Sequence, residues 1–552
     1  MTTTSPAATT SGILAAALGE ALPRLCAAGA PVDPRLGALI TALAAALETG
    51  VLELDLSAGT PEGLDPQGWP EAYRAALERS PLAVRAACLE QAPEAPLVLA
   101  GDRLRWRRWH LELEHVLSQL LQRARDPLPE APPPTLLAEA RRQAAAAGLD
   151  ERQQQAVEAA LGQRLLLLSG GPGTGKTSTV VQLLAALLRQ QPGLRLQLAA
   201  PTGKAAARLR EAIERDGRQL EPELVDPLLA VPCSTLHRLL ESSGERFGRH
   251  AQRPLELDLL VVDELSMVDL PLMAALLDAL PPACRLVLVG DPAQLPPVGP
   301  GAVLQELMQP PWRPQLGAAA VELRTTYRNA GAIAAVAADL RLAGPISLER
   351  ISTRLRGLDP AANLQGLQAP PRQPPAAVIA ALSRHQEQLA ALAAALSWRA
   401  GEVLAEEAYG PLLSELERCV ALTPVRQGPW GVQGLHRQLL GEAAGRSLAH
   451  WPLGTPVLNQ RNLPEQGLAN GDVGVLVGNG RERRVLFSAG RLLHPARLGQ
   501  AQPALALTVH KSQGSQYGTV WLLLPPGRDW DARLLYTGLT RAREQAWLVT
   551  PG

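Results

Sequence analysis

Short apolar runs alternate with helical patterns along much of the chain. From residue 149 onward, such runs fall at 165–169, 194–201, 257–264 and 284–291. A second series falls at 419–425, 505–510, 520–525 and 546–551. Continuous apolar runs between helical segments are typical of strands that are buried on both faces of a parallel sheet. The pattern therefore predicts an α/β fold with two parallel-sheet lobes.

The other segments carry different patterns. Residues 456–499 show short alternating stretches and the turn Asn470-Gly471-Asp472, which predict a small antiparallel β module inserted at about 440–502. Residues 12–125 are mostly helical in pattern, and five prolines within 126–135 favour extended chain. We therefore expect an N-terminal domain over 1–125, a linker over 126–148, a first lobe over 149–345 and a second over 346–552.

Bulk composition excludes some classes of protein. An apolar content of 46% and a charged content of 19% describe a globular chain. The formal net charge of zero does not decide about DNA, because a local groove can carry the positive potential. The five cysteines are scattered without a CxxC pair, so a zinc or iron–sulfur site is not expected. The sequence has neither a signal-peptide pattern nor an apolar stretch of membrane-spanning length, so a cytoplasmic location without membrane contact is expected.

A basic cluster surrounds two tryptophans before the second long helical pattern. Its members are Arg103, Arg105, Arg107 and Arg108, with Trp106 and Trp109. The cluster is compatible with a contact surface for a partner or a nucleic acid. A solvated strand face explains it equally well.

Lysine is nearly absent from the chain. Of 53 basic residues only Lys176, Lys204 and Lys511 are lysines. A solvated charge tolerates replacement by arginine, whereas a compact ammonium between phosphates does not, because a guanidinium is planar and bulkier. These three positions are therefore candidates for sites where the shape of the cation matters.

The first lysine lies in a phosphate-binding pattern. Residues 170–177 read GGPGTGKT, which satisfies GxxxxGK[ST] between an apolar strand and a helix. In this motif, backbone N–H groups surround phosphates, the lysine reaches the β- and γ-phosphates, and the threonine hydroxyl coordinates Mg²⁺. The predicted cofactors are ATP and Mg²⁺. The residues predicted to bind them here are Gly170, Gly171, Pro172, Gly173, Thr174, Gly175, Lys176, Thr177 and Ser178.

Polar residues at two other strand ends suit the same chemistry. Asp263 and Glu264 end a buried strand, where Asp263 can hold Mg²⁺ and Glu264 can orient and deprotonate water. A plain acidic pair on the surface is the alternative. Gln294 follows the next strand, and its amide can sense the γ-phosphate or position water.

Taken in order, these segments resemble the motifs of superfamily 1 DNA helicases. The matching segments are 149–157 (the Q motif), 170–177 (motif I), 200–209 (motif Ia), 234–240, 261–264 (motif II), 290–299 (motif III), 323–329 (motif IV), 506–517 (motif V) and 536–544 (motif VI). The resemblance implies two RecA-like lobes with ATP between them. It implies that Gln153 contacts the adenine and that Arg328 and Arg541 act on the γ-phosphate. Gly514 and Gln516 would line the same cleft. The implied DNA-binding residues are Thr202, Lys204, His237, Thr423, Thr508, His510 and Lys511.

Three further segments are similar to the RecD family. These are TPVRQGPWGVQGLHRQL at 423–439, the pair 456–462 and 468–476 within the small β (SH3-like) module, and 48–57 with 96–114 in the N-terminal region. The resemblance implies a 5′→3′ motor on single-stranded DNA that processes duplex ends for recombinational repair beside RecB-like and RecC-like subunits. Nuclease activity is expected from a partner. A stand-alone RecD-like helicase and a non-motor regulatory ATPase subunit are the alternatives.

Overall fold

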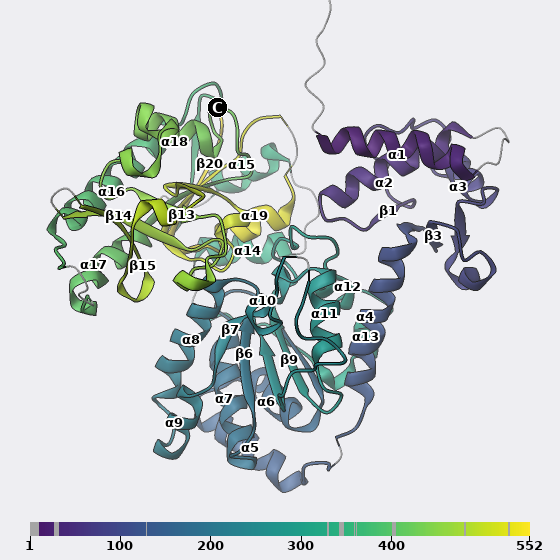
Figure 1. Cartoon of the computed structure of the whole chain (residues 1–552), viewed down its shortest axis with the longest axis horizontal. Coiled ribbons are helices and arrows are strands. Elements are labelled where there is room, and N and C mark those ends of the chain that lie inside the picture. Colours follow the sequence, from purple (N-terminus) through teal and green to yellow (C-terminus); the bar gives the residue numbers. More distant parts are fainter. Residues whose placement is uncertain are drawn as a thin grey trace, which may run out of the picture.

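The computed structural model describes residues 10–26, 33–128, 130–244, 246–327, 331–341, 347–357, 359, 361–399, 404–479, 482–527 and 530–552. Figure 1 shows the first lobe below, the second lobe at the upper left and the N-terminal region at the upper right. The fold class predicted from the sequence is confirmed. The chain is α/β, with two parallel sheets, an inserted antiparallel sheet and a helix-rich N-terminal region.

A parallel sheet with the strand order β10-β5-β9-β8-β6-β7 forms the first lobe. Its strands are β5 (Leu165–Gly170), β6 (Leu196–Ala200), β7 (Cys233–Thr235), β8 (Leu259–Val262), β9 (Arg285–Gly290) and β10 (Ala320–Leu323). The helices around it are α5 (Pro134–Ala146), α6 (Glu151–Gly162), α7 (Lys176–Gln190), α8 (Gly203–Gly217), α9 (Pro222–Leu229), α10 (Leu236–Leu239), α11 (Leu270–Ala279), α12 (Val303–Leu307) and α13 (Trp312–Gln315).

The apolar runs of this sheet are buried on both faces. Along β5, Leu165 and Leu167 enter the core that faces α11, while Leu166 and Leu168 enter the core that faces α6 and α7. This division follows from the twofold alternation of side chains along a strand. A continuous apolar run therefore suits a strand that is covered by helices on both sides.

The second lobe repeats this arrangement with the strand order β11-β20-β19-β12-β18. Its strands are β11 (Leu364–Ala369), β12 (Cys419–Thr423), β18 (Ala506–Thr508), β19 (Tyr517–Leu523) and β20 (Ala542–Pro551), all in parallel pairs. Its helices are α14 (Ala332–Arg341), α15 (Leu348–Arg356), α16 (Ala376–Ala395), α17 (Glu406–Leu416), α18 (Val432–Leu440) and α19 (Ala532–Leu539). Strand β11 lies within residues 357–375, a passage rich in proline and glycine, and was not predicted.

The predicted β module is an antiparallel sheet between β12 and β18. Its order is β16-β15-β14-β13-β17. The strands are β13 (Pro456–Asn459), β14 (Val473–Asn479), β15 (Glu482–Phe487), β16 (Arg491–Leu493) and β17 (Ala501–Pro503). One face of the sheet packs against α16 and α17, where Val475 and Leu486 share a core with Leu389 and Leu412.

The N-terminal region combines helices with a small sheet. Helices α1 (Thr10–Cys26) and α2 (Pro34–Glu48) cross so closely that a Cβ on Gly19 would lie 2.6 Å from the Gly37 oxygen. Helix α3 (Glu71–Glu78) and a sheet of order β1-β4-β3-β2 complete it. The strands are β1 (Glu53–Asp55), β2 (Ala83–Arg85), β3 (Leu97–Ala100) and β4 (Arg103–Trp106).

The helices on either side of residue 126 pack onto the first lobe. In α4 (Arg107–Arg125), Leu113 and Leu117 enter the same core as Leu165, and the buried Arg123 donates to the Cys284 oxygen at 2.9 Å. Helix α5 lies within the predicted linker and packs against α6 and α7. The domain boundaries drawn from the sequence stay predictions, and both neighbouring helices contribute to the core of lobe 1.

The basic cluster was interpreted either as a contact surface or as a solvated strand face. The structure supports neither interpretation for Arg103, Arg105 and Arg107. Arg105 is 4% exposed, and its Nε donates to Glu53 at 2.7 Å. Arg103 pairs with Glu53 at 3.4 Å and with Glu306 of α12 at 3.5 Å. Arg107 donates to the backbone oxygens of Leu89 and Ala92. The cluster therefore fastens the N-terminal sheet to lobe 1, because a guanidinium can bond several oxygens at once.

Candidate active site

The phosphate-binding loop lies between β5 and α7, as predicted. Gly173 and Gly175 have φ of +75° and +77°, which favours glycine. A Cβ on Gly175 would lie 2.3 Å from the Gln153 amide nitrogen, so that position also lacks space for a side chain. The Lys176 ammonium donates to the oxygens of Gly170 and Gly171 at 2.7 and 2.9 Å. The loop is therefore a buried to half-buried run of backbone with one cation over it.

Several polar side chains hold this loop in shape. The Thr174 hydroxyl donates to the Gly171 oxygen at 2.9 Å. The Gln153 amide is 3% exposed; it donates to the Thr174 oxygen at 3.1 Å and accepts from the Asp150 N–H at 2.9 Å. Gln153 thus supports the loop, and its adenine contact stays a prediction. The Ser178 hydroxyl bonds Asp216 of α8 at 3.1 Å, away from the loop.

An aromatic residue, Tyr327, lies beside the loop. From the sequence it was included only within the matching segment 323–329. Tyr327 is 57% exposed, its N–H donates to the Gly173 oxygen at 2.8 Å, and its hydroxyl donates to Asp150 at 2.8 Å. An exposed ring that is fixed at both ends offers a flat surface on which a nucleobase can stack. The neighbouring Arg328 lies outside the described residues.

The acidic pair follows β8 directly. Burial raises the pKa of Asp263 to about 6, with the Glu264 carboxylate adding to the rise and Lys176 opposing it. Glu264 has φ of +53°, a conformation that is rare for a residue with a side chain and is often found at functional sites. A carboxylate that is held near another carboxylate suits a divalent cation. The surface-pair alternative is not supported, because both residues are half-buried.

The segment around Gln294 forms a buried seam with the second lobe, which we call the motif III seam. The Tyr536 hydroxyl donates to Asp291 at 2.7 Å. The Leu295 N–H donates to the Thr537 hydroxyl at 2.8 Å, and the Gln513 amide donates to the Leu295 oxygen at 3.0 Å. Gln294 is 4% exposed, and within the described part of the chain its amide oxygen has no hydrogen-bond partner. The seam therefore joins motif III to motifs V and VI.

Arg541 faces this seam from the second lobe. It is 3% exposed and donates to the backbone oxygens of Thr537 and Ser515 at 3.0 and 3.3 Å. Burial lowers its pKa, while the Glu264 and Asp291 carboxylates raise it. The guanidinium therefore lies within electrostatic reach of the acid that would activate water. Gly514 was also predicted to line the cleft. A Cβ on Gly514 would lie 3.5 Å from both the Thr202 hydroxyl and the Ala205 Cβ, at the start of α8.

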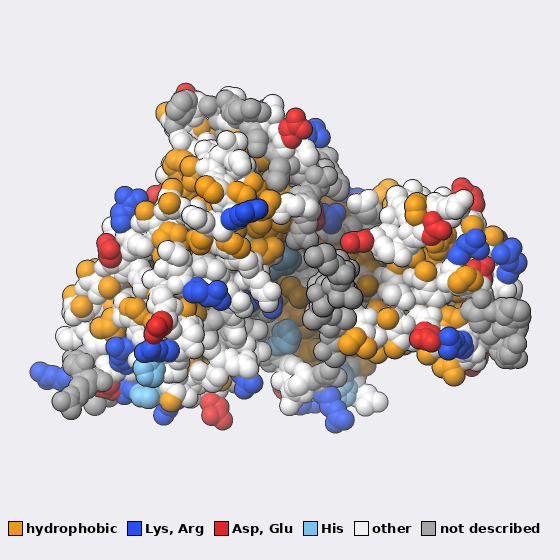
Figure 2. Space-filling view, turned by 90° about the horizontal axis from the view of Figure 1, so that it is seen from above, with side chains coloured by type: hydrophobic (Ala, Val, Ile, Leu, Met, Phe, Trp, Pro, Cys, Tyr) orange, Lys and Arg blue, Asp and Glu red, His pale blue; other side chains and the backbone are white. Residues whose placement is uncertain are grey.

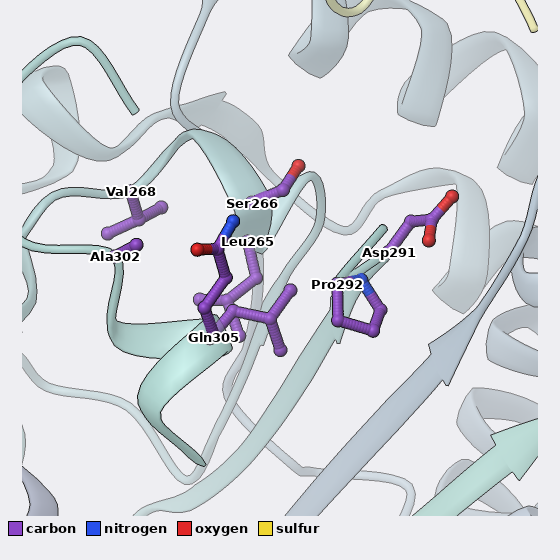
Figure 3. A pocket seen from close by; sticks show the side chains of 8 residues that line it. Leu265, Ser266, Val268, Asp291, Pro292, Ala302 and Gln305 are labelled. Atoms are coloured by element: carbon purple, nitrogen blue, oxygen red, sulfur yellow. The ribbon is translucent and has the colours of Figure 1, made fainter. Parts of the chain in front are cut away.

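A narrow crevice lies between motifs II and III (Figure 3). It is lined by Leu265 and Ser266, which follow the acidic pair in the sequence, by Asp291, and by Gln305 of α12. Ser266 is 5% exposed, and its hydroxyl has no hydrogen-bond partner in the described residues. Gln305 accepts a bond of 2.8 Å from Arg533 of α19. The crevice is thus part of the same seam and adds no separate site.

The predicted DNA-binding residues lie at the carboxyl ends of strands and near the lobe interface. Thr423 and Thr508 are register partners at the ends of β12 and β18. Both are buried, and their hydroxyls accept weakly from the N–H groups of Val425 and Lys511 at 3.4 Å. The Thr202 hydroxyl caps α8 by accepting from the Ala205 N–H at 3.2 Å. Each hydroxyl therefore accepts one backbone bond within the protein and keeps its own proton for donation.

The other DNA candidates are more accessible. His237 on α10 is exposed, while His510 and Lys511 are half-buried. Burial and the Arg426 charge lower the pKa of both His510 and Lys511. Figure 2 shows the molecule hollowed between the second lobe and the N-terminal region, with histidine side chains inside the hollow.

Lys204 lies in a second contact between the lobes, which we call the α8 seam. Its ammonium lies 5.5 Å from the centre of the Tyr517 ring. On the next turn, Arg208 pairs with Glu417 at 3.0 Å and donates to the Gln516 oxygen at 3.4 Å. The structure thus brings Lys204 and Gln516 together, but in a seam on the α8 side. In the described part of the chain, neither Lys204 nor Gln516 is among the residues that contact the phosphate loop by a hydrogen bond.

Comparison with known proteins follows the same order along the chain. A family model of AAA domains matches residues 153–300, and a model of UvrD-like helicase C-terminal domains matches residues 503–549. RecBCD enzyme subunit RecD of Mycolicibacterium smegmatis is 36% identical over 508 residues, covering 87% of this chain and 82% of that protein. ATP-dependent RecD2 DNA helicase of Deinococcus radiodurans is 33% identical over 70% of this chain but only 46% of its own length.

Solved structures add only a loose likeness. The crystal structure of Bacteroides Pif1 bound to ssDNA is 18% identical, with a TM-score of 0.38 over 73% of this chain and 92% of that chain. A score at that level supports no argument about function. Among the residues that the structure describes, no helix is both long and apolar enough to cross a bilayer.

Proposed function

The chain belongs to the RecD family, and from that premise we propose that it is an ATP-dependent 5′→3′ DNA helicase and translocase. We propose further that it is the motor subunit of an exodeoxyribonuclease V-type complex with RecB-like and RecC-like subunits, processing duplex DNA ends for recombinational repair. The observation that carries the motor is the motif III seam. It joins Asp291 and Leu295 of the first lobe to Tyr536 and Thr537 of the second by hydrogen bonds of 2.7 and 2.8 Å.

The residues fit ATP with Mg²⁺. The loop of residues 170–177 would supply backbone N–H groups and Lys176 for the phosphates. Thr177 and Asp263 would hold Mg²⁺, and the crowding of Asp263 by Glu264 supports a cation there. When bound, Mg²⁺ would neutralise charge on the phosphates. Tyr327 is the group best placed to stack on the base, beside Gln153.

Hydrolysis and movement then follow from the chain's own residues. Glu264 is positioned to take a proton from the attacking water, and Arg541 to stabilise charge on the transferred phosphoryl group. Among the described residues the buried Gln294 amide oxygen has no hydrogen-bond partner, and it could position the attacking water. Because Arg541 and Tyr536 belong to the second lobe, a change in phosphate charge alters contacts that hold the lobes together. This is how hydrolysis would open and close the cleft.

The DNA contacts remain proposals. Thr202, Thr423 and Thr508 mark the carboxyl edges of the parallel sheets, where ligands of such folds bind. Their hydroxyls accept within the protein and keep a proton to donate to a phosphate, while His237, His510 and Lys511 would offer cationic or imidazole side chains. Groups of this kind hold phosphates without reading base sequence.

Hydrolysis by the purified chain tests the motor. We expect single-stranded DNA to stimulate ATP hydrolysis, and Glu264→Gln to retain nucleotide binding while losing turnover. Equal rates with and without DNA would contradict a motor and favour the regulatory ATPase. Co-purification with RecB-like and RecC-like subunits from native extract tests the complex. A monomer in that extract would favour the stand-alone helicase.

A further inference from the structure

The β module sits directly on the first turn of α8. A Cβ on Gly203 would lie 2.6 Å from the Ala469 Cβ and 3.3 Å from an Asp472 carboxylate oxygen. Glycine is therefore needed there to let the two backbones approach. The Asp472 carboxylate lies at the amino end of α8, where the helix dipole favours a negative charge.

The loop that makes this contact is held in shape before it reaches α8. The Asp472 carboxylate accepts from the Ala469 N–H at 2.8 Å. The fully buried Asn459 donates to the Ala469 oxygen at 2.7 Å, and its own backbone oxygen accepts from the Gly471 N–H at 2.9 Å. The loop therefore presents Asp472 in a fixed position.

Lys204 follows Gly203 and meets charges from two other parts of the chain. Asp472 of the β module and Glu417 of the second lobe both act on its ammonium, as do the cations Arg208 and Arg543. Glu417 is itself paired with Arg208 at 3.0 Å and with Arg543 at 3.1 Å. Tyr517 places its ring beside the ammonium. A cation here is attracted to both carboxylates and to the ring face.

We propose that Lys204 is a positioning residue that ties motif Ia of the first lobe to both the second lobe and the β module. The inference rests on the proposed motor function and changes the role that the sequence suggested for Lys204, which was a DNA phosphate contact. By joining three parts of the chain through one cation, Lys204 holds the lobes in register when DNA stimulates hydrolysis. Burial lowers its pKa to about 8 despite the two carboxylates, so the fold keeps this charge at a cost.

Lys511 provides a matched control, because it is the other lysine outside the phosphate loop. We expect Lys204→Met to lower the DNA-stimulated kcat about tenfold, within the usual range of coupling between sites. The affinity for single-stranded DNA and its salt dependence should keep their wild-type values. Lys511→Met should instead weaken DNA binding and make its salt dependence shallower. Weakened, less salt-dependent binding in Lys204→Met would overturn the proposal.

A charge-reversal cycle separates this role from general damage to the fold. Lys204→Glu should lower both the DNA-stimulated rate and the melting temperature, and adding Asp472→Lys should restore most of each. A double variant no better than Lys204→Glu overturns the pairing. Melting is measured without DNA or ATP, so it tests the pairing independently. A wild-type chain that DNA does not stimulate would overturn the proposed function instead.

Discussion

The two seams between the lobes are built from different chemistry. In the motif III seam, buried groups such as the Tyr536 hydroxyl and the Leu295 backbone form directional hydrogen bonds. In the α8 seam, half-exposed charges such as Lys204, Arg208 and Glu417 face one another. Buried bonds are insensitive to salt, whereas exposed charges are screened by it. From this difference we infer that the motif III seam fixes the geometry of catalysis and that the α8 seam is an adjustable contact.

Substituting the loop lysine should have the largest effect. Lys176→Ala removes the cation over the phosphate loop, so DNA-stimulated hydrolysis should fall to background. Lys176→Arg should fail as well, because a planar guanidinium does not fit where the ammonium bonds two adjacent carbonyls. Turnover is measured by phosphate release. Wild-type turnover in the arginine variant would contradict the argument from shape.

Two arginines at the start of β20 distinguish the seams: Arg541 lies just before the strand and Arg543 lies within it. Arg541→Ala should lower kcat by about 10³-fold or more, because it removes the charge offered to the phosphoryl group. Arg543→Ala removes only the half-exposed pair with Glu417, worth about 1 kcal/mol or less and therefore about fivefold at most. Steady-state kinetics with saturating DNA measures both. Similar losses in the two variants would erase the distinction.

Loss of one buried bond tests the rigidity of the motif III seam. Tyr536→Phe leaves the buried Asp291 carboxylate without its 2.7 Å donor and should destabilise the chain by about 1–3 kcal/mol. Denaturant unfolding at low and high salt should give the same loss. A loss that vanishes at high salt would mean that this seam also depends on screened charge.

The smallest predicted effect is a pH step from the α8 seam. Lys204 is charged below its pKa of about 8 and neutral above it, so the DNA-stimulated rate should fall as pH rises from 7 to 9. The other charged groups facing it are Arg208, Arg543, Glu417 and Asp472, together with Tyr517, whose pKa burial raises. In Lys204→Arg the charge persists and the step should disappear. An identical profile in that variant would assign the step to another group.

What the sequence could predict depended on how local the signal is. The strands β5, β8 and β9 and the phosphate loop follow from apolar runs and one contiguous motif. The edge strand β11 and the N-terminal sheet were missed, because short or half-exposed strands carry little pattern. The pairing of Tyr536 with Asp291, 245 residues apart, and the close approach of Gly203 to Asp472 exist only in the folded chain. The buried ion pair of Arg105 with Glu53 was missed for the same reason.

Strand displacement on tailed duplexes tests the central claim most directly. Duplexes with a 5′ single-stranded tail or a 3′ tail are mixed with the chain and ATP, with and without its partner subunits, and Lys176→Ala serves as the control. We predict ATP-dependent displacement of the 5′-tailed duplex, little of the 3′-tailed one, and none with Lys176→Ala. DNA-stimulated hydrolysis without displacement of either duplex would contradict the account.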